Sequence, residues 1–197
     1  SPVHNLDIKC AFIINMEKSK LKKAIIDQKE EIESLSSRTK IIERSCFEKY
    51  KAYTESTQVK VIMGIRRCGK SILSYQLLKD KLFAYINFDD ENLANLTAED
   101  LNDVLEVFYE VYGDFKYILL DEIQNIAGWE LFVNRLQRQR FNVIVTGSNA
   151  NLLSKELSTH LTGRNIPLEL YPFSFREFIK YHGVVTGNTG LLSTKER

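Results

Sequence analysis

The chain has 197 residues, of which 44% are hydrophobic, with 27 Lys and Arg residues against 26 Asp and Glu residues. This length and apolar content suit one domain with an extension and exclude a broadly disordered chain, while a net charge of +1 excludes a bulk polycation for nucleic acid. The three cysteines (Cys10, Cys46 and Cys68) suggest neither a disulfide framework nor a zinc site, and no apolar run reaches membrane-spanning length, so we expect a cytoplasmic protein with no membrane partner.

Residues 1–56 predict a helical extension, because glycine is absent from them and charged residues are dense. Apolar side chains recur at helical spacing over 17–35, which indicates a helix that packs along one side; a coiled-coil arm is the alternative. A second helix is expected over 40–53. We expect Met16 to be the native start and residues 1–15 to be a foreign leader, so this leader is left out of the functional argument.

From Val59 onward, short apolar segments alternate with helical ones. Strands are expected over 59–63, 84–88, 117–120, 142–145 and 166–170, and helices over 71–79, 98–112, 129–139 and 151–161. This alternation predicts an α/β fold of three layers, in which helices cover both faces of a five-stranded, mostly parallel sheet.

Residues 64–71 read GIRRCGKS and fit the pattern G-x-x-x-x-G-K-[ST] between an expected strand and an expected helix. Such a loop, the P-loop, turns backbone N–H groups inward, and the helix after it adds its positive end, so the loop binds phosphate. Lys70 is expected to reach the β- and γ-phosphates of the ligand, and Ser71 to bind Mg²⁺. The other nucleotide-binding positions are Gly64, Arg67, Cys68, Gly69 and Ile72. Arg66 and Arg67 either raise the local potential or contact a partner; solvated loop charges are the alternative.

The expected strand over 117–120 runs directly into two carboxylates, Asp121 and Glu122. The carboxyl ends of parallel strands face the ligand crevice. We therefore expect Asp121 to hold Mg²⁺ and Glu122 to act as the general base that activates the attacking water. Asp89 and Asp90 also follow a strand and are rival candidates for the metal.

Three further residues are candidates for contact with the γ-phosphate. Ser148 and Asn149 follow the strand over 142–145, and either could hydrogen-bond the phosphate or the attacking water; a helix N-cap is the alternative role. Arg164 precedes the last strand and could stabilise transition-state charge in the same or a neighbouring subunit; a cation at a helix end is the alternative.

Six segments, in this order, resemble the prokaryotic AAA-type ATPases that carry a second, poorly characterised domain at the carboxyl end. They are residues 64–71 (GIRRCGKS), 86–90 (INFDD), 120–125 (LDEIQN), 146–149 (TGSN), 161–164 (LTGR) and 172–178 (PFSFREF). The resemblance implies an AAA-like P-loop NTPase sheet with the P-loop strand near its middle, ATP and Mg²⁺ as ligands, and Asp121 and Glu122 as the paired carboxylates. It also implies Ser148 or Asn149 as the sensor and Arg164 as an arginine finger or γ-phosphate sensor.

On this basis, residues 57–182 are expected to be the ATPase domain, and residues 183–197 a flexible tail where the family continues into its second domain. One function that fits is a Mg-dependent ATPase, weakly active on its own, that drives an attached C-terminal domain or partner. The other is a nucleotide-gated module that binds protein or DNA with little hydrolysis, which the basic cluster Arg135, Arg138 and Arg140 favours. A homo-oligomer is compatible with both, and residues 40–53 are candidates for adenine contacts.

Overall fold

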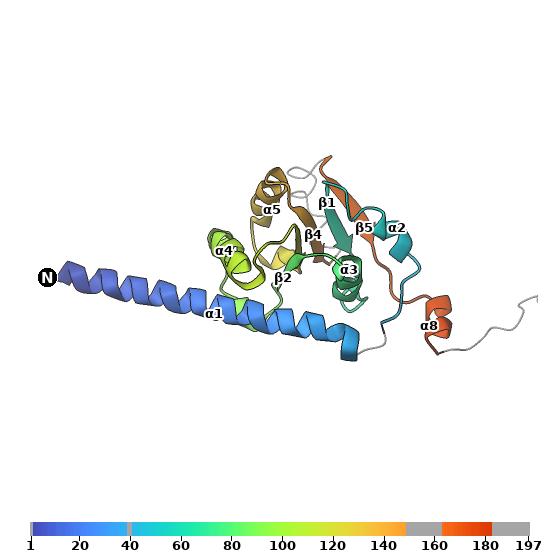
Figure 1. The fold of residues 1–197 in the computed structure, drawn as a ribbon, viewed down its shortest axis with the longest axis horizontal. Helices are drawn as coiled ribbons and strands as arrows, with labels where there is room; N and C mark the ends of the chain where they lie inside the picture. Colours follow the sequence, from blue (N-terminus) through green and yellow to red (C-terminus); the bar gives the residue numbers. More distant parts are fainter. Residues whose placement is uncertain (1, 39–40, 149–162, 183–197) are drawn as a thin grey trace, which may run out of the picture.

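A computed structural model describes residues 2–38, 41–148 and 163–182 of the chain. In these ranges, one five-stranded sheet has the order β2-β3-β4-β1-β5, and every neighbouring pair is parallel (Figure 1). The strands are β1 (Val59–Met63), β2 (Phe83–Asn87), β3 (Tyr117–Asp121), β4 (Asn142–Gly147) and β5 (Asn165–Glu169). The α/β prediction of five mostly parallel strands is confirmed, and β1 lies between β4 and β5.

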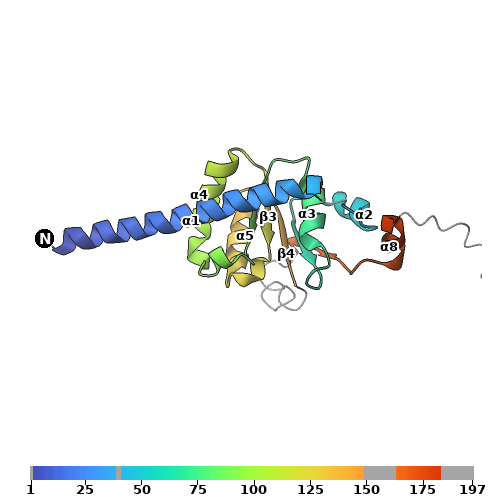
Figure 2. The same cartoon turned by 90° about the horizontal axis from the view of Figure 1, so that it is seen from below.

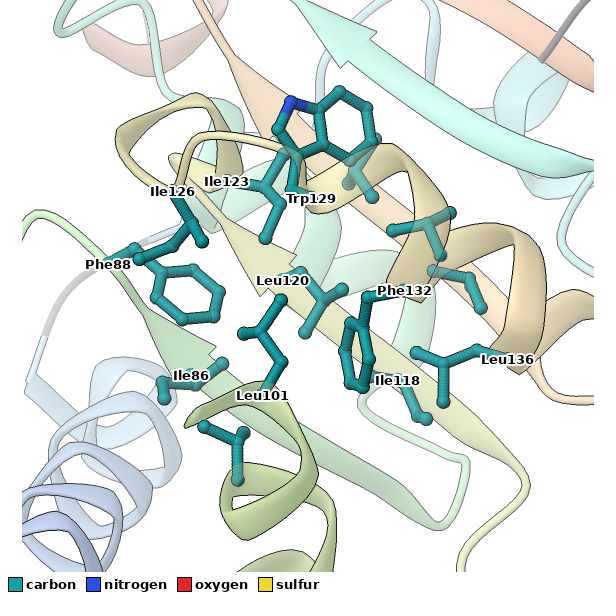
Figure 3. Packing of buried hydrophobic residues seen from close by; sticks show 14 of the residues in the cluster. Ile86, Phe88, Leu101, Ile118, Leu120, Ile123, Ile126, Trp129, Phe132 and Leu136 are labelled. Atoms are coloured by element: carbon teal, nitrogen blue, oxygen red, sulfur yellow. The ribbon is translucent and has the colours of Figure 1, made fainter. Parts of the chain in front are cut away.

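Helices cover both faces of the sheet, as the strand patterns predicted. Helices α4 (Leu101–Tyr112) and α5 (Trp129–Arg138) lie on one face, and α3 (Lys70–Leu78) lies on the other. Alternate strand residues supply the two cores: Ile118 and Leu120 of β3 pack against α4 and α5, as Figure 3 shows, while Leu119 packs on the α3 side. Burial on both faces explains why β1, β3 and β4 are apolar without alternation.

The amino-terminal helix α1 (Pro2–Arg38) is one continuous helix of 37 residues, longer than the segment 17–35 that was expected. Leu21, Ala24 and Ile25 are buried against the core beneath α4, which confirms a helix that packs along one side. Figures 1 and 2 show that the helix crosses below the sheet and that its first turns extend past the other elements. None of the helices in the described ranges combines the length and hydrophobicity needed to span a membrane.

Gln28 of α1 fixes this helix to the edge strand β2. Its side-chain oxygen accepts the N–H of Asn87 at 2.8 Å, and its amide donates to the Asn87 carbonyl at 3.2 Å and to the Asp90 carboxylate at 2.7 Å. The helix therefore covers backbone groups that an edge strand would otherwise leave open.

The expected helix over 40–53 is wrong in extent, because the structure has only α2 (Phe47–Lys51) there. The N–H of Ser45 donates to the Glu177 carboxylate, and the guanidinium of Arg44 binds two other segments, so residues 41–46 follow tertiary partners instead of a helix ladder. Helix α4 likewise begins at Leu101, after a 3₁₀ turn over Ala98–Asp100. The helix expected over 151–161 lies outside the described residues. Helix α8 (Phe175–His182) had no predicted counterpart.

Candidate functional site

The P-loop, residues 64–71, links the end of β1 to the start of α3 with a backbone that two glycines permit. A Cβ atom on Gly64 would lie 2.3 Å from the carbonyl oxygen of Leu170, so only glycine fits beside the chain that follows β5. Gly69 caps α3 with φ +97°, in the left-handed region that favours glycine. Arg67 also has a positive φ of 65°. The turns of the P-loop and the start of α3 thus fall where the sequence pattern predicted them.

Lys70 is buried at the first turn of α3, with 4% of its surface exposed. Its ammonium nitrogen lies 3.2 Å from the carbonyl oxygen of Gly64 and 3.3 Å from that of Ile65, and it lies 3.2 Å from Oε1 of Glu122. The lysine therefore braces the loop and reaches the acidic end of β3. A phosphate in the loop would compete with Glu122 for this ammonium.

Asp121 ends β3 and is 1% exposed. Its carboxylate accepts hydrogen bonds from the hydroxyl of Thr146 in the neighbouring strand β4 and from that of Tyr85 in β2, the latter at 3.4 Å. Burial raises the pKa of Asp121, although the nearby hydroxyls of Ser71 and Thr146 lower it. Burial also raises the pKa of Tyr85, so its hydroxyl stays a donor.

Oxygen ligands converge beside this carboxylate in a way that suits Mg²⁺. Ser71 and Asp121 line one cavity of about 460 Å³ together with Asn87 and Asp90. Hydroxyl and carboxylate oxygens are the ligands that Mg²⁺ takes, usually with water and substrate phosphates completing the shell. Within the described part of the chain, no three His, Cys, Asp or Glu side chains gather as a metal site of their own. The donor set therefore fits a Mg²⁺ ion held jointly with phosphate oxygens.

Glu122 turns out of the strand and toward the P-loop. Its backbone has φ 51°, and its N–H donates to the Thr146 hydroxyl at 3.0 Å. The carboxylate contacts Lys70 and accepts a 2.6 Å hydrogen bond from the amide of Gln124. Because about a fifth of the side chain (21%) is exposed, water can reach it. The left-handed turn thus gives the two adjacent carboxylates different positions, one buried and one at the mouth of the site.

The rival acidic residues are occupied by other contacts. Strand β2 lies at the far edge of the sheet, with β3 and β4 between it and the P-loop strand β1. Asp89 forms an exposed ion pair with Arg66 at 2.8 Å, and Asp90 accepts hydrogen bonds from Gln28 and Asn92. These contacts favour Asp121 as the metal ligand. The ion pair also gives Arg66 a partner in the same chain.

Two of the three γ-phosphate candidates can be placed. Ser148 directly follows β4 at the carboxyl edge of the sheet, where the neighbouring strand β1 leads into the P-loop. Asn149 lies outside the described residues. Arg164 lies at the opposite edge, because β5 runs parallel to β1 and pairs Asn165 with Val59. The five residues of β1 separate it from the P-loop, which is about 17 Å at strand spacing. This separation argues against contact between Arg164 and a nucleotide in its own subunit, and the roles predicted for Arg164 stay predictions.

A second cavity, of about 230 Å³, lies beyond Gly69 along the outer side of α3. It is lined by residues of three segments: Ile41, Ile42 and Arg44; Arg67, Gly69, Ile72, Leu73 and Gln76; and Phe173 and Tyr181. The side-chain oxygen of Gln76 is buried and has no hydrogen-bond partner among the described residues. These aliphatic and aromatic walls suit a flat heterocycle.

Several residues at the site escaped the sequence reasoning. Thr146 was part of a quoted motif without a role, although a polar residue late in an apolar strand was a usable signal. Phe173 was likewise part of a quoted motif, 172–178, without a role. Arg44 carried no local signal, since its contacts depend on segments far apart in the chain.

A phosphate-binding loop between the first strand and its helix, with a carboxylate at the end of a strand beside it, defines a P-loop NTPase domain. Residues 56–179 match the family model described as "AAA domain", and the chain belongs to this family of prokaryotic AAA-type ATPases. Helix α1 precedes the matched range.

The chain is also similar to curated proteins and to solved structures. The uncharacterized protein MJ1544 of Methanocaldococcus jannaschii is 36% identical over 181 residues, which cover 89% of this chain and 39% of that protein. An uncharacterized protein of Haemophilus influenzae is 38% identical over 140 residues, or 64% of this chain and 34% of that one. The chain thus spans about two fifths or less of these relatives. The Walker-type ATPase PABY2304 of Pyrococcus abyssi shares the fold, with a TM-score of 0.50 and 19% identity over 73% of this chain and 57% of that one.

Proposed function

We propose that this AAA domain binds ATP with Mg²⁺ and hydrolyses it to ADP and phosphate. The observation that carries the proposal is the position of Glu122, whose carboxylate lies 3.2 Å from the Lys70 ammonium and next to the buried Asp121. A base beside the P-loop lysine and the metal carboxylate is placed to act on a water that attacks the γ-phosphate.

Each part of the nucleotide has a counterpart at the site. The P-loop backbone and Lys70 bind the phosphates, and the oxygens of Ser71 and Asp121 hold Mg²⁺, which neutralises charge that develops on the phosphates. The adenine occupies the cavity of about 230 Å³, between its aliphatic and aromatic side chains. Ile41 and Ile42 line that cavity, so residues of the region 40–53 would contact the adenine.

Phosphate binding also prepares the base. When the γ-phosphate takes the Lys70 ammonium, the Glu122 carboxylate is released from its ion pair and can accept a hydrogen bond from the attacking water. Thr146 holds both carboxylate residues in register, because its hydroxyl donates to Asp121 and accepts the N–H of Glu122. Ser148 or Asn149 would contact the γ-phosphate from the end of β4.

The substitution Glu122→Gln tests the proposal, because it keeps the shape of the side chain and removes its basicity. We expect ATP binding to stay within about threefold of the parent, and turnover with Mg-ATP to fall by about 10²- to 10⁴-fold. Asp89→Asn, at the exposed rival carboxylate, is the matched control and should hydrolyse ATP at the parental rate. Turnover by Glu122→Gln at the parental rate would overturn the assignment of this base.

A nucleotide-gated binding module is the second candidate, and exposed aromatic residues on the last described helix favour it. Phe175 and Phe178 of α8 are 77% and 55% exposed, which suits a contact with another domain or protein. In the first candidate function, residues 57–182 are the ATPase unit, and ATP hydrolysis moves an attached C-terminal domain. ATP binding without measurable turnover by the parent chain would favour the gated module.

A further inference from the structure

Arg44 lies buried behind the P-loop and joins three segments through one guanidinium. Nη1 donates to the carbonyl oxygen of Cys68 at 2.9 Å, Nη2 to that of Tyr171 at 2.5 Å, and Nε to Oε1 of Glu177 at 3.1 Å. Glu177 lies 133 positions further along the chain and is also buried. One side chain thus connects the P-loop to the segment that leads into α8.

The bond to Cys68 bears directly on phosphate binding. In a trans peptide the C=O and the following N–H point in opposite directions. Since the Cys68 carbonyl is held by Arg44, the N–H of Gly69 points away from Arg44, and a phosphate-binding loop uses N–H groups that face inward. A charged donor on the carbonyl also polarises this peptide, which makes its N–H a stronger donor to an anion. Arg44 therefore sets both the direction and the strength of one phosphate contact.

Glu177 fixes the other end of the connection. One of its oxygens accepts the N–H and the hydroxyl of Ser45, and the other accepts the N–H and the hydroxyl of Ser174 at the start of α8. Burial would raise the pKa of Glu177, but the backbone N–H groups of Ser45 and Ser174 and the guanidinium of Arg44 lower it to about 2. The carboxylate is therefore charged across the physiological pH range and ties α8 to Arg44.

The cavity assigned to adenine lies between the same segments. Ile41 and Ile42 line it on one side and Phe173 and Tyr181 on another, and the ring of Phe173 stacks on the Arg44 guanidinium at 4.3 Å. A base in this cavity contacts residues on both sides of the Arg44–Glu177 pair, while the phosphates contact the peptide that Arg44 holds.

We propose that Arg44 is a positioning residue of the phosphate site and that, through Glu177, it couples nucleotide binding to the position of α8. This inference rests on the proposed function, because it assigns regulation to the same site. Coupling of this kind is reciprocal: nucleotide holds α8 in place, and a partner that holds α8 tightens nucleotide binding.

The test measures two properties of the parent chain and its variants, the Kd for Mg-ATP and the hydrogen exchange of residues 175–182 with and without Mg-ATP. In the parent, ATP should slow exchange in α8. Arg44→Gln should weaken ATP binding by about tenfold to a hundredfold, and Arg44→Lys should restore little of it, because an ammonium cannot make the three diverging bonds. Glu177→Gln should weaken ATP binding less and abolish the ATP-dependent protection of α8. Arg176→Gln, at the exposed neighbour of Glu177, is the control and should match the parent.

The outcomes separate this inference from the proposed function. A parent chain that binds no ATP would overturn both. A parent that binds ATP without any change of exchange in α8 would overturn the coupling alone, as would Glu177→Gln behaving like the parent. If the variants only lower Tm, and their folded fraction binds ATP with the parental Kd, the pair is structural and the inference is wrong. If Arg44→Gln does not fold, Glu177→Gln still decides between these outcomes.

Discussion

A lysine is buried at each end of the parallel strands, which we call the carboxyl edge and the amino edge of the sheet, and the two lysines have different surroundings. At the carboxyl edge, Lys70 is 4% exposed and contacts two loop carbonyls and the Glu122 carboxylate. At the amino edge, Lys60 is 1% exposed, and its ammonium donates only to the carbonyl oxygen of Ser56 among the bonds described. Burial lowers the pKa of Lys60 to about 8, although Glu55 opposes this shift.

The comparison teaches why function gathers at one edge. A buried ammonium lowers stability unless an opposite charge pairs with it. Lys70 has such a partner, and because it can exchange the Glu122 carboxylate for a phosphate, it can bind a ligand. Lys60 has no ion-pair partner among the described residues, so its burial lowers the stability of the fold. The carboxyl edge also holds the start of α3 and the inward-facing loop backbone. Substitutions at the two edges should therefore have opposite consequences.

The largest expected effect is at the carboxyl edge. Lys70→Ala removes the ammonium that reaches the phosphates and leaves the partly buried Glu122 without its cation. We expect Mg-ATP to bind about a hundredfold more weakly, since bonds between charged groups are the strong ones. Calorimetric titration measures this, with Lys79→Ala at the exposed end of α3 as the control. ATP binding with the parental affinity would show that the P-loop lysine does not reach the nucleotide.

The next effect lies on β4, beside the two carboxylates. Thr146→Val keeps the shape of the side chain but removes one of the hydroxyl donors to Asp121, which keeps the bond from Tyr85, and leaves the N–H of Glu122 without its acceptor. We expect turnover to fall by about tenfold to a hundredfold while the Kd for Mg-ATP changes little, because each unsatisfied buried group costs about 1–3 kcal/mol. Thr146→Ser retains the hydroxyl and should recover most of the turnover in a steady-state assay. Equal turnover by the valine and serine variants would remove Thr146 from the site.

At the amino edge, replacing the buried lysine is expected to be favourable, because it stabilises the fold. The Lys60 ammonium has a pKa of about 8 in the folded chain against 10.5 when exposed, so unfolding takes up a proton between these values and stability rises with pH there. This difference in pKa corresponds to a cost of about 3 kcal/mol for burying the charged Lys60 ammonium. Replacing Lys60 removes this cost but also loses the hydrogen bond to Ser56, which contributes about 1 kcal/mol. Lys60→Met should therefore stabilise the fold by about 1–2 kcal/mol at pH 7, and less at pH 10. Denaturant unfolding at both pH values checks this, and a larger gain at pH 10 would contradict it.

The difference between the edges also explains how far the sequence could predict the site. The continuous apolar run over 117–120 marked β3, and the glycine pattern marked the P-loop, because these signals lie within a few neighbouring residues. The contacts of Arg44 with Glu177 depend on packing between segments 133 positions apart, so no local pattern announces them. The shortened helix α2 has the same cause, since Ser45 gives its N–H to Glu177.

The prediction for Arg164 raises a different point, and it gives the smallest expected effect. The predicted parallel sheet already implies that a residue just before a strand lies at the amino edge, away from the P-loop. Arg164→Ala should therefore leave Mg-ATP affinity and turnover of dilute protein within about twofold of the parent, because exposed substitutions far from the site change little. Turnover measured over a range of protein concentrations extends this test to a neighbouring subunit. If the parental rate per chain rises with concentration and the rise is lost in Arg164→Ala, the arginine acts across subunits. A loss of turnover in dilute protein would instead contradict the separation of the two edges.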